Sequence, residues 1–228
     1  MFNRFDSKYS TFLTILLIVA IVAILGLVIF FAYSAYKNAS LDSEAGKIVQ
    51  QFEDETKQIE RDENTVASNG ASPFDEIRTT ESGSGGNKVV KFEDYIVVGT
   101  IRIPKTGIKY PVLSKVTKRS IEIAVAIQYG PGAPDNPTVN EVGNTVIIGH
   151  NYRNGLFFSN NKNLNIGDTI SITDNGGREI IYVIYNKYET APTDTEYMTR
   201  DVNGKREISL STCSDDGNSR IIIWAREQ

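Results

Sequence analysis

The decisive stretch of this chain is Ile208-Ser209-Leu210-Ser211-Thr212-Cys213, whose composition predicts a β-strand that ends at a cysteine. The polar residues 214–219 predict a turn, after which Arg220-Ile221-Ile222-Ile223-Trp224 predicts the next strand. One thiol and one guanidinium therefore stand at neighbouring strand-to-loop junctions. This arrangement is expected of a cysteine nucleophile and of a cation that faces an oxyanion.

The single histidine of the chain has a similar position. His150 follows the strand-like run Thr145-Val146-Ile147-Ile148-Gly149 and precedes a loop. Because an imidazole titrates near neutral pH, His150 is a candidate proton-transfer partner for the thiol of Cys213. Each residue also has a structural interpretation, since a lone cysteine often packs as a small hydrophobe and Arg220 could be a solvated charge at a strand end.

Charge and composition exclude several classes of function. With a net charge of −4 and a pI near 5.2, the chain has no basic footprint for nucleic acid. One cysteine and one histidine cannot supply a thiolate-rich zinc site, and the sequence contains no Gly-rich phosphate-binding loop after a strand and no helix-borne metal motif. The adjacent Asp215 and Asp216 are interpreted as turn residues, with cation binding as the alternative.

Residues 11–36 predict a transmembrane helix. The segment carries no charged residue, and about 20 apolar residues suffice to cross a bilayer. Arg4 and Lys8 precede it, so the positive-inside tendency places residues 1–10 in the cytoplasm and the C-terminal domain outside. We therefore expect a single-pass protein of the plasma membrane with an extracellular domain. A cleaved signal peptide is the open alternative.

Residues 37–87 predict a stalk in two parts. Residues 40–63 have apolar side chains at helical spacing, with Ser40 as a candidate N-cap, and predict an amphipathic helix that rests one face on the domain. A partner-binding or dimerising helix is the alternative. The Gly- and Ser-rich residues 68–87 predict a flexible tether, because this composition buries too little apolar surface to become ordered.

Residues 88–228 predict a compact, mainly β domain. Seven or eight short strands separated by turn signals favour a closed β-barrel, with short helices such as one over residues 120–127. The run Asp174-Asn175-Gly176-Gly177 predicts a hairpin turn. The strand-like runs cover residues 97–103, 108–112, 145–149, 169–173, 179–188, 207–212 and 221–226.

Taken together, these residues resemble the sortases, membrane-anchored cysteine transpeptidases of Gram-positive bacteria. The resemblance rests on Leu210-Ser211-Thr212-Cys213, on Arg220 in the following strand, on Gly149-His150 upstream and on the N-terminal anchor. It covers roughly residues 95–226, and Ser209 replaces the threonine with which the family's motif normally begins.

The resemblance implies a sortase-like β-barrel and a mechanism that requires no metal and no organic cofactor. Cys213 would attack the threonine carbonyl of a Leu-Pro-x-Thr-Gly-like sorting signal, and His150 would transfer protons to and from the amines. Arg220 would hold the substrate backbone and the oxyanion, and Thr212 is expected to contribute to substrate binding. The implied partners are the sorting-signal peptide of a surface protein or pilin and an amine acceptor, either a peptidoglycan cross-bridge or a pilin lysine.

The subclass stays open between class B-like and pilus-type, class C-like sortases. Ser72-Pro73-Phe74-Asp75 is similar to the lid of pilus-type members, so Pro73 and Phe74 are a possible lid, with a turn in the tether as the alternative. Two other functions are also open. One is a non-catalytic, membrane-anchored β-domain that binds cell-wall or pilin components with an inert Cys213, and the other is a thiol hydrolase.

Overall fold

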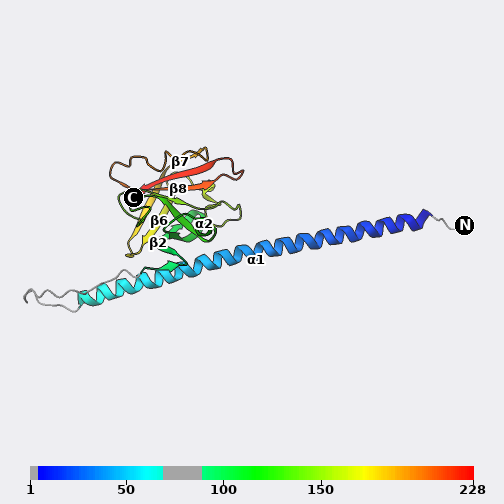
Figure 1. Ribbon diagram of the computed structural model, residues 1–228, viewed down its shortest axis with the longest axis horizontal. Helices are drawn as coiled ribbons and strands as arrows, with labels where there is room; N and C mark the ends of the chain where they lie inside the picture. The colour runs from blue at the N-terminus through cyan, green and yellow to red at the C-terminus, as the bar shows by residue number, and fades with distance from the viewer. Residues whose placement is uncertain (1–4, 69–88) are drawn as a thin grey trace, which may run out of the picture. The chain divides into compact units, whose positions relative to one another are not determined.

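A computed structural model describes residues 5–68 and 89–228 (Figure 1). The predicted tether from residue 69 onward, and with it the possible lid at Pro73 and Phe74, lies outside the described residues. The described residues form two compact units, Met1–Leu41 and Asp42–Gln228. The second unit contains the β-structure and every candidate catalytic residue.

The first helix, α1 (Phe5–Ser68), includes the predicted transmembrane segment. It is the helix among the described residues that is long and apolar enough to cross a membrane, by length and composition. Its apolar side chains are exposed, for example 60% for Leu17 and 68% for Ile29. The prediction of Ser40 as an N-cap is wrong, because α1 continues through this position; no proline interrupts the chain there, so each backbone amide keeps its helical partner.

Within the second unit, one face of α1 packs on the β-domain. Ala45, Ile48, Val49 and Phe52 are buried, and their spacing places them on a single face of the helix. Ion pairs of Glu44 with Arg119 and of Glu53 with Lys109 flank this face. The helical part of the predicted stalk therefore rests on the domain, as its amphipathic pattern indicated.

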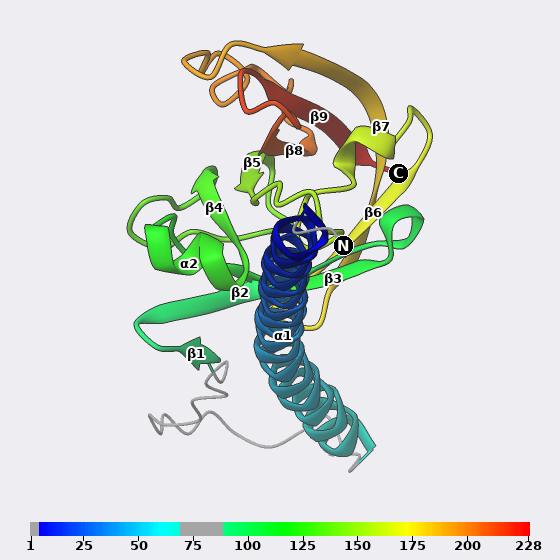
Figure 2. The same cartoon turned by 90° about the vertical axis from the view of Figure 1, so that its right-hand side faces the viewer.

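The strands close into a barrel, as the sequence predicted (Figures 1 and 2). Their order is β1-β2-β3-β4-β5-β8-β9-β7-β6, and an additional pairing of β2 with β6 closes the sheet. The β3–β4 and β5–β8 pairs are parallel, and the other pairs are antiparallel. The strands are β1 (Lys91–Phe92), β2 (Tyr95–Ile103), β3 (Ile108–Leu113), β4 (Val125–Tyr129), β5 (Gly143–Ile148), β6 (Thr169–Asp174), β7 (Glu179–Thr190), β8 (Arg206–Cys213) and β9 (Arg220–Glu227).

The helix predicted over residues 120–127 is only partly correct. The structure has α2 (Lys118–Ile123), which begins at a capping box formed by Thr117 and Ser120. Residues 125–127 instead belong to β4, because their β-branched and small side chains fill a place in the sheet between β3 and β5. Two short 3-10 helices complete the fold, η1 (Pro104–Thr106) and η2 (Asn161–Asn163).

The two faces of β8 and β9 contact different hydrophobic clusters. Side chains of one parity point into the barrel interior and join its main core: Ile208, Leu210, Ile221, Ile223 and Ala225. Side chains of the other parity face the connection between β7 and β8, where Ile222 packs with Val146 and Tyr197. This second face is the one that continues to the candidate site.

Candidate active site

The hairpin of β8 and β9 holds Cys213 and Arg220 opposite each other. They are the last Cα partners of the pair, and the guanidinium Nη1 lies 3.9 Å from the Sγ of Cys213. The Ser214 amide donates to the Ser219 carbonyl at 2.9 Å, which closes the turn directly beyond them. Gly217 adopts a φ of 75°, a left-handed conformation that glycine tolerates without strain. The turn over residues 214–219 therefore places the side chains of Cys213 and Arg220 opposite each other at the two strand ends.

Both side chains belong to the face of the hairpin that points away from the barrel interior, and both are half-buried. Thr212 has the opposite parity. It is buried, and its Oγ1 has no hydrogen-bond partner among the described residues. The structure therefore does not bring the Thr212 side chain to the thiol, so its predicted part in substrate binding cannot come from a hydroxyl beside Cys213.

His150 reaches the same place from β5. In the parallel β5–β8 pair, Ile148 is the partner of Ser211, and the Gly149 amide donates to the Ser211 carbonyl at 3.2 Å. His150 and Cys213 each stand two positions beyond this last pair, so the register brings the ends of both strands together (Figure 2). A Cβ on Gly149 would lie 2.8 Å from the Phe158 ring and 2.9 Å from Val125, so only glycine fits before the histidine.

The imidazole of His150 is half-buried against an aromatic ring. Its centroid lies 4.7 Å from that of Tyr152, with the planes 29° apart. Burial lowers the pKa of His150 below its ordinary value, and the negative charge of Glu122 on α2 partly opposes this shift. At neutral pH the imidazole is therefore mainly uncharged, and in this form its ring can accept a proton.

A side-chain bridge that sequence reasoning missed joins the His150 loop to the cysteine. Asn151 Nδ2 donates to the main-chain oxygen of Cys213 at 2.9 Å and to Asp215 Oδ1 at 3.0 Å. Asp215 also forms an ion pair with Lys162 at 2.5 Å, and these contacts lower the pKa of its carboxyl group. An amide directly after the only histidine was the available signal, but asparagine is so common in loops that it stood out little.

The two adjacent carboxylates thus have different roles. Asp216 accepts from the Ser214 hydroxyl at 2.5 Å and from the Asn218 amide at 3.1 Å, which is turn chemistry. Asp215 instead points across to the loop after His150. Over residues 5–68 and 89–228, no group of three or more His, Cys, Asp or Glu side chains is arranged to hold a metal ion.

The connection between β7 and β8 lies beside Arg220. The Nε of Arg220 donates to the Pro192 carbonyl at 3.4 Å, which leaves Nη1 directed to the sulfur. Farther along the connection, Arg200 pairs with the buried Glu207 and stacks on Trp224, 4.5 Å from the ring centroid. The connection is thereby fastened to the face of the sheet that carries the thiol.

Comparisons with known proteins agree with this architecture. Residues 101–228 match the family model described as the sortase domain. No curated protein matches the chain significantly.

Among solved structures, a sortase D5 transpeptidase from Clostridium perfringens is similar, with 22% identity and a TM-score of 0.58 over 82% of this chain and 99% of that one. A lid mutant of sortase A from Corynebacterium diphtheriae has 22% identity and a TM-score of 0.51, over 59% and 72% of the two chains. Sortase C1 from Streptococcus suis has 20% identity and a TM-score of 0.50, over 57% and 72%. These likenesses show the shared fold, and the family model spans more than half of the sequence, so the chain belongs to the sortases, a family of cysteine transpeptidases.

Proposed function

We propose that Cys213 is the nucleophile of this transpeptidase, that His150 is its general acid and base, and that Arg220 stabilises the oxyanion. One observation carries the proposal: the Arg220 guanidinium lies 3.9 Å from the Cys213 sulfur, at the strand end that the β5–β8 register brings next to His150. A half-buried thiol at a strand end, beside a fixed cation, is accessible to a peptide. A cysteine enclosed in the hydrophobic core would not be accessible to a peptide.

The reaction follows from these positions. The neutral imidazole of His150 accepts the proton of the Cys213 thiol, and the resulting thiolate adds to the threonine carbonyl of a Leu-Pro-x-Thr-Gly-like signal. The Thr–Gly bond then breaks as the imidazolium donates this proton to the departing glycine amine. The neutral imidazole then takes a proton from the acceptor amine, which attacks the thioester and releases Cys213. Arg220 offers planar N–H donors to the oxygen that carries negative charge in both tetrahedral intermediates.

Sortases act on sorting signals of surface proteins and pilins, and the specific partners of this chain are part of the proposal. The acceptor is a peptidoglycan cross-bridge amine or a pilin lysine. Residues 11–36 anchor the chain in the plasma membrane, with residues 1–10 inside and the barrel outside. A contribution of Thr212 to substrate binding stays a prediction, and its side chain is buried. Pro73 and Phe74 stay a predicted lid, for which Phe74→Ala is the direct test.

The experiment uses the full chain in detergent micelles with a fluorogenic Leu-Pro-x-Thr-Gly peptide, with and without triglycine. We expect cleavage that depends on Cys213 and His150, and a triglycine adduct detected by mass spectrometry. Cys213→Ala should abolish both, and His150→Ala should lower turnover by about a hundred- to ten-thousand-fold. Cleavage without any adduct would instead identify a thiol hydrolase.

A labelling experiment separates an active thiol from a structural one. Because Cys213 is the only cysteine, a small thiol-reactive sulfonate reports on this residue alone. We expect rapid modification of the folded chain, with loss of turnover in proportion to labelling. Modification that requires denaturant would support the non-catalytic binding domain, and turnover that survives complete labelling would contradict the assignment of Cys213.

A further inference from the structure

An unbroken series of ring contacts leads from His150 to Tyr110 of β3. The imidazole stacks on Tyr152, with centroids 4.7 Å apart. Tyr152 meets the edge of Phe157 at 5.6 Å and 70°. Phe157 in turn stacks on Tyr110 of β3, at 4.9 Å and 21°. Offset stacking and edge-to-face contacts are the favourable geometries for such pairs, so each ring restrains the next.

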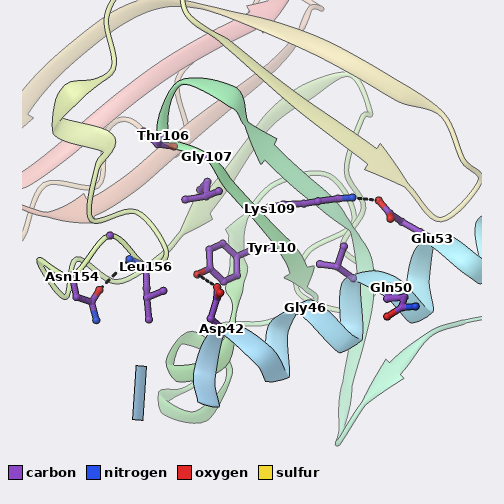
Figure 3. A pocket seen from close by; sticks show the side chains of 13 residues that line it. Asp42, Gly46, Gln50, Glu53, Thr106, Gly107, Lys109, Tyr110, Asn154 and Leu156 are labelled. Atoms are coloured by element: carbon purple, nitrogen blue, oxygen red, sulfur yellow. Dashed lines mark hydrogen bonds and ion pairs between the residues drawn. The ribbon is translucent and has the colours of Figure 1, made fainter. Parts of the chain in front are cut away.

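The other end of this series is fastened to α1. The Tyr110 hydroxyl donates to Asp42 Oδ1 at 3.2 Å, and both side chains line a cavity of about 610 Å³ that is bounded by α1, the β2–β3 turn and residues 154–156 (Figure 3). Burial, together with the charge and the hydrogen bond of Asp42, raises the pKa of Tyr110 to about 12, although a hydrogen bond with the Phe157 backbone acts in the opposite direction. The phenol therefore stays protonated and joins the helix to the loop that follows His150.

This loop has a backbone that needs support. Arg153 and Phe157 have φ values of 58° and 50°, in the left-handed region that residues with a Cβ seldom adopt. Such a conformation persists only where the surroundings hold it. Here the Phe157 side chain is 1% exposed, and the Phe158 amide donates to the His150 carbonyl at 3.0 Å. The buried ring of Phe157 thus holds the loop in place, and the position of the His150 imidazole depends on the start of this loop.

We propose that Tyr110, Phe157 and Tyr152 form an aromatic series that positions the imidazole of His150, and that Asp42 couples this series to α1. The inference rests on the proposed function of His150 as acid and base. Tyr152 restricts rotation of the imidazole toward solvent, and Tyr110 holds Phe157 and its strained backbone in place. These are positioning residues, because they act on the reaction through His150.

The first test measures His150 directly in the full chain, without a polyhistidine tag, in detergent micelles. Because His150 is the only histidine, its imidazole NMR signals can be followed through a pH titration without assignment. The variants are Tyr152→Leu, which keeps apolar volume but not the flat ring, and Tyr152→Phe, which keeps the ring. Tyr129→Leu is the matched control, since Tyr129 is 42% exposed and Tyr152 39%.

We expect Tyr152→Leu to lower kcat by about ten- to a hundredfold with little change in KM, because a misplaced acid–base group slows chemistry rather than peptide binding. The pKa of His150 should move up toward its ordinary value as the ring that helps to bury it is lost. Tyr152→Phe should restore both properties, and Tyr129→Leu should leave both unchanged.

A second test addresses the coupling to α1. Asp42→Ala removes the acceptor of the Tyr110 hydroxyl, whereas Asp42→Asn keeps an oxygen at that place. Gln50→Ala is the control, because Gln50 lines the same cavity outside the ring series. We expect Asp42→Ala to lower kcat by about two- to tenfold, as for the loss of one hydrogen bond, and the other two variants to stay near the wild type.

Two patterns distinguish failure of this inference from failure of the proposed function. If His150→Ala abolishes turnover while Tyr152→Leu changes neither kcat nor the imidazole titration, the positioning inference is overturned and the catalytic assignment stands. If His150→Ala retains turnover, both fall. A Tyr152→Leu chain that unfolds, seen as loss of the native Trp224 fluorescence, is replaced by Phe157→Leu, for which the same kinetic and NMR outcomes decide.

Discussion

The two halves of the site are built by different means. Cys213 and Arg220 belong to adjacent strands, and their separation follows from the β8–β9 register and a six-residue connection closed by its own hydrogen bonds. His150 lies just beyond β5, in a segment with left-handed residues that ring contacts and Asn151 hold in place. The first half is defined by the backbone, and the second by side chains.

This difference predicts different sensitivities. A backbone-defined pair tolerates changes in its neighbours, because many ladder hydrogen bonds maintain the register, and it loses function mainly when a reacting group itself is replaced. A side-chain-defined group loses its geometry gradually, as each contact is removed. The half that carries Cys213 should therefore respond in an all-or-none manner, and the half that carries His150 in steps.

Apart from the replacement of Cys213 or His150, the largest effect is expected at Arg220. Arg220→Lys keeps the charge but loses the planar donors, and removal of one oxyanion donor typically costs about a hundred- to a thousandfold in kcat. Arg220→Ala should be at least as severe, with thermal unfolding little changed because the strand register persists. Peptide cleavage and Trp224 fluorescence measure the two properties, and Arg102→Lys on β2 is the control. Retained kcat in Arg220→Lys would reassign Arg220 to a structural role.

The next effect is expected at Gly149, where the two halves meet. A methyl group in Gly149→Ala would press on the Phe158 ring and on Val125, and overpacking of this kind costs about 1–3 kcal/mol. We expect a lower unfolding temperature together with reduced kcat. Gly26→Ala is the control, because a Cβ there meets no atom within 4 Å. An unchanged unfolding temperature and kcat in Gly149→Ala would mean that β5 and the loop with Phe158 can shift to make room for the methyl group at little cost.

A smaller effect is expected at Asn151. Asn151→Ala removes the donor to the Cys213 carbonyl and to Asp215, and the loss of such hydrogen bonds costs about 1 kcal/mol, or roughly fivefold in kcat. Lys162→Met leaves Asn151 in place and removes an exposed ion pair, so it should change kcat less. Asn163→Ala is the control. Equal losses of kcat in Lys162→Met and Asn151→Ala would show that the contacts of Asp215, rather than the bond of the Asn151 amide to the Cys213 carbonyl, hold the loop after His150 beside Cys213.

The smallest effect concerns stability at mildly acidic pH. Burial lowers the pKa of His150 below its ordinary 6.5, so as pH falls the unfolded chain takes up the proton first. This contribution to stability is complete above that pH and is lost as pH falls toward the folded-state pKa. In His150→Asn, the decline in unfolding free energy between about pH 7 and pH 5 should be shallower than in the wild type. If urea titrations give parallel pH profiles of the unfolding free energy for His150→Asn and the wild type, this expectation is wrong.

Much of the fold follows from the sequence because strand pattern and turn chemistry are local signals. The β-branched runs, the turn after β6 and the polar segment between β8 and β9 predicted a closed barrel and placed Cys213 and Arg220 at facing ends. The position of His150 at the end of a strand was also predictable. The sequence leaves open whether β5 and β8 are neighbours, because the pairing of strands distant in sequence has no local signal.

What the sequence did not predict depends on tertiary contacts. The β-branched Val125 and Ile127 favour a strand, but they directly follow a helical segment, so the boundary is decided by the place between β3 and β5. Likewise, Tyr110, Phe157 and Tyr152 come from separate segments, so their contacts exist only in the folded barrel. The Thr212 side chain is buried because it alternates with Cys213 along β8 and so points to the opposite face. The prediction for Thr212 came from the resemblance and did not take this alternation into account.

The position of β9 has a consequence for the order in which the protein becomes competent. β9 is the last strand of the barrel in chain order, yet it lies between β8 and β7, which are both made earlier. A growing polypeptide can therefore pair β5 with β8 while Cys213 still lacks its guanidinium and two strand edges stay open. Insertion of β9 closes those edges and brings Arg220 to the thiol at the same moment, so completion of the barrel and assembly of the proposed nucleophile with its cation are one event.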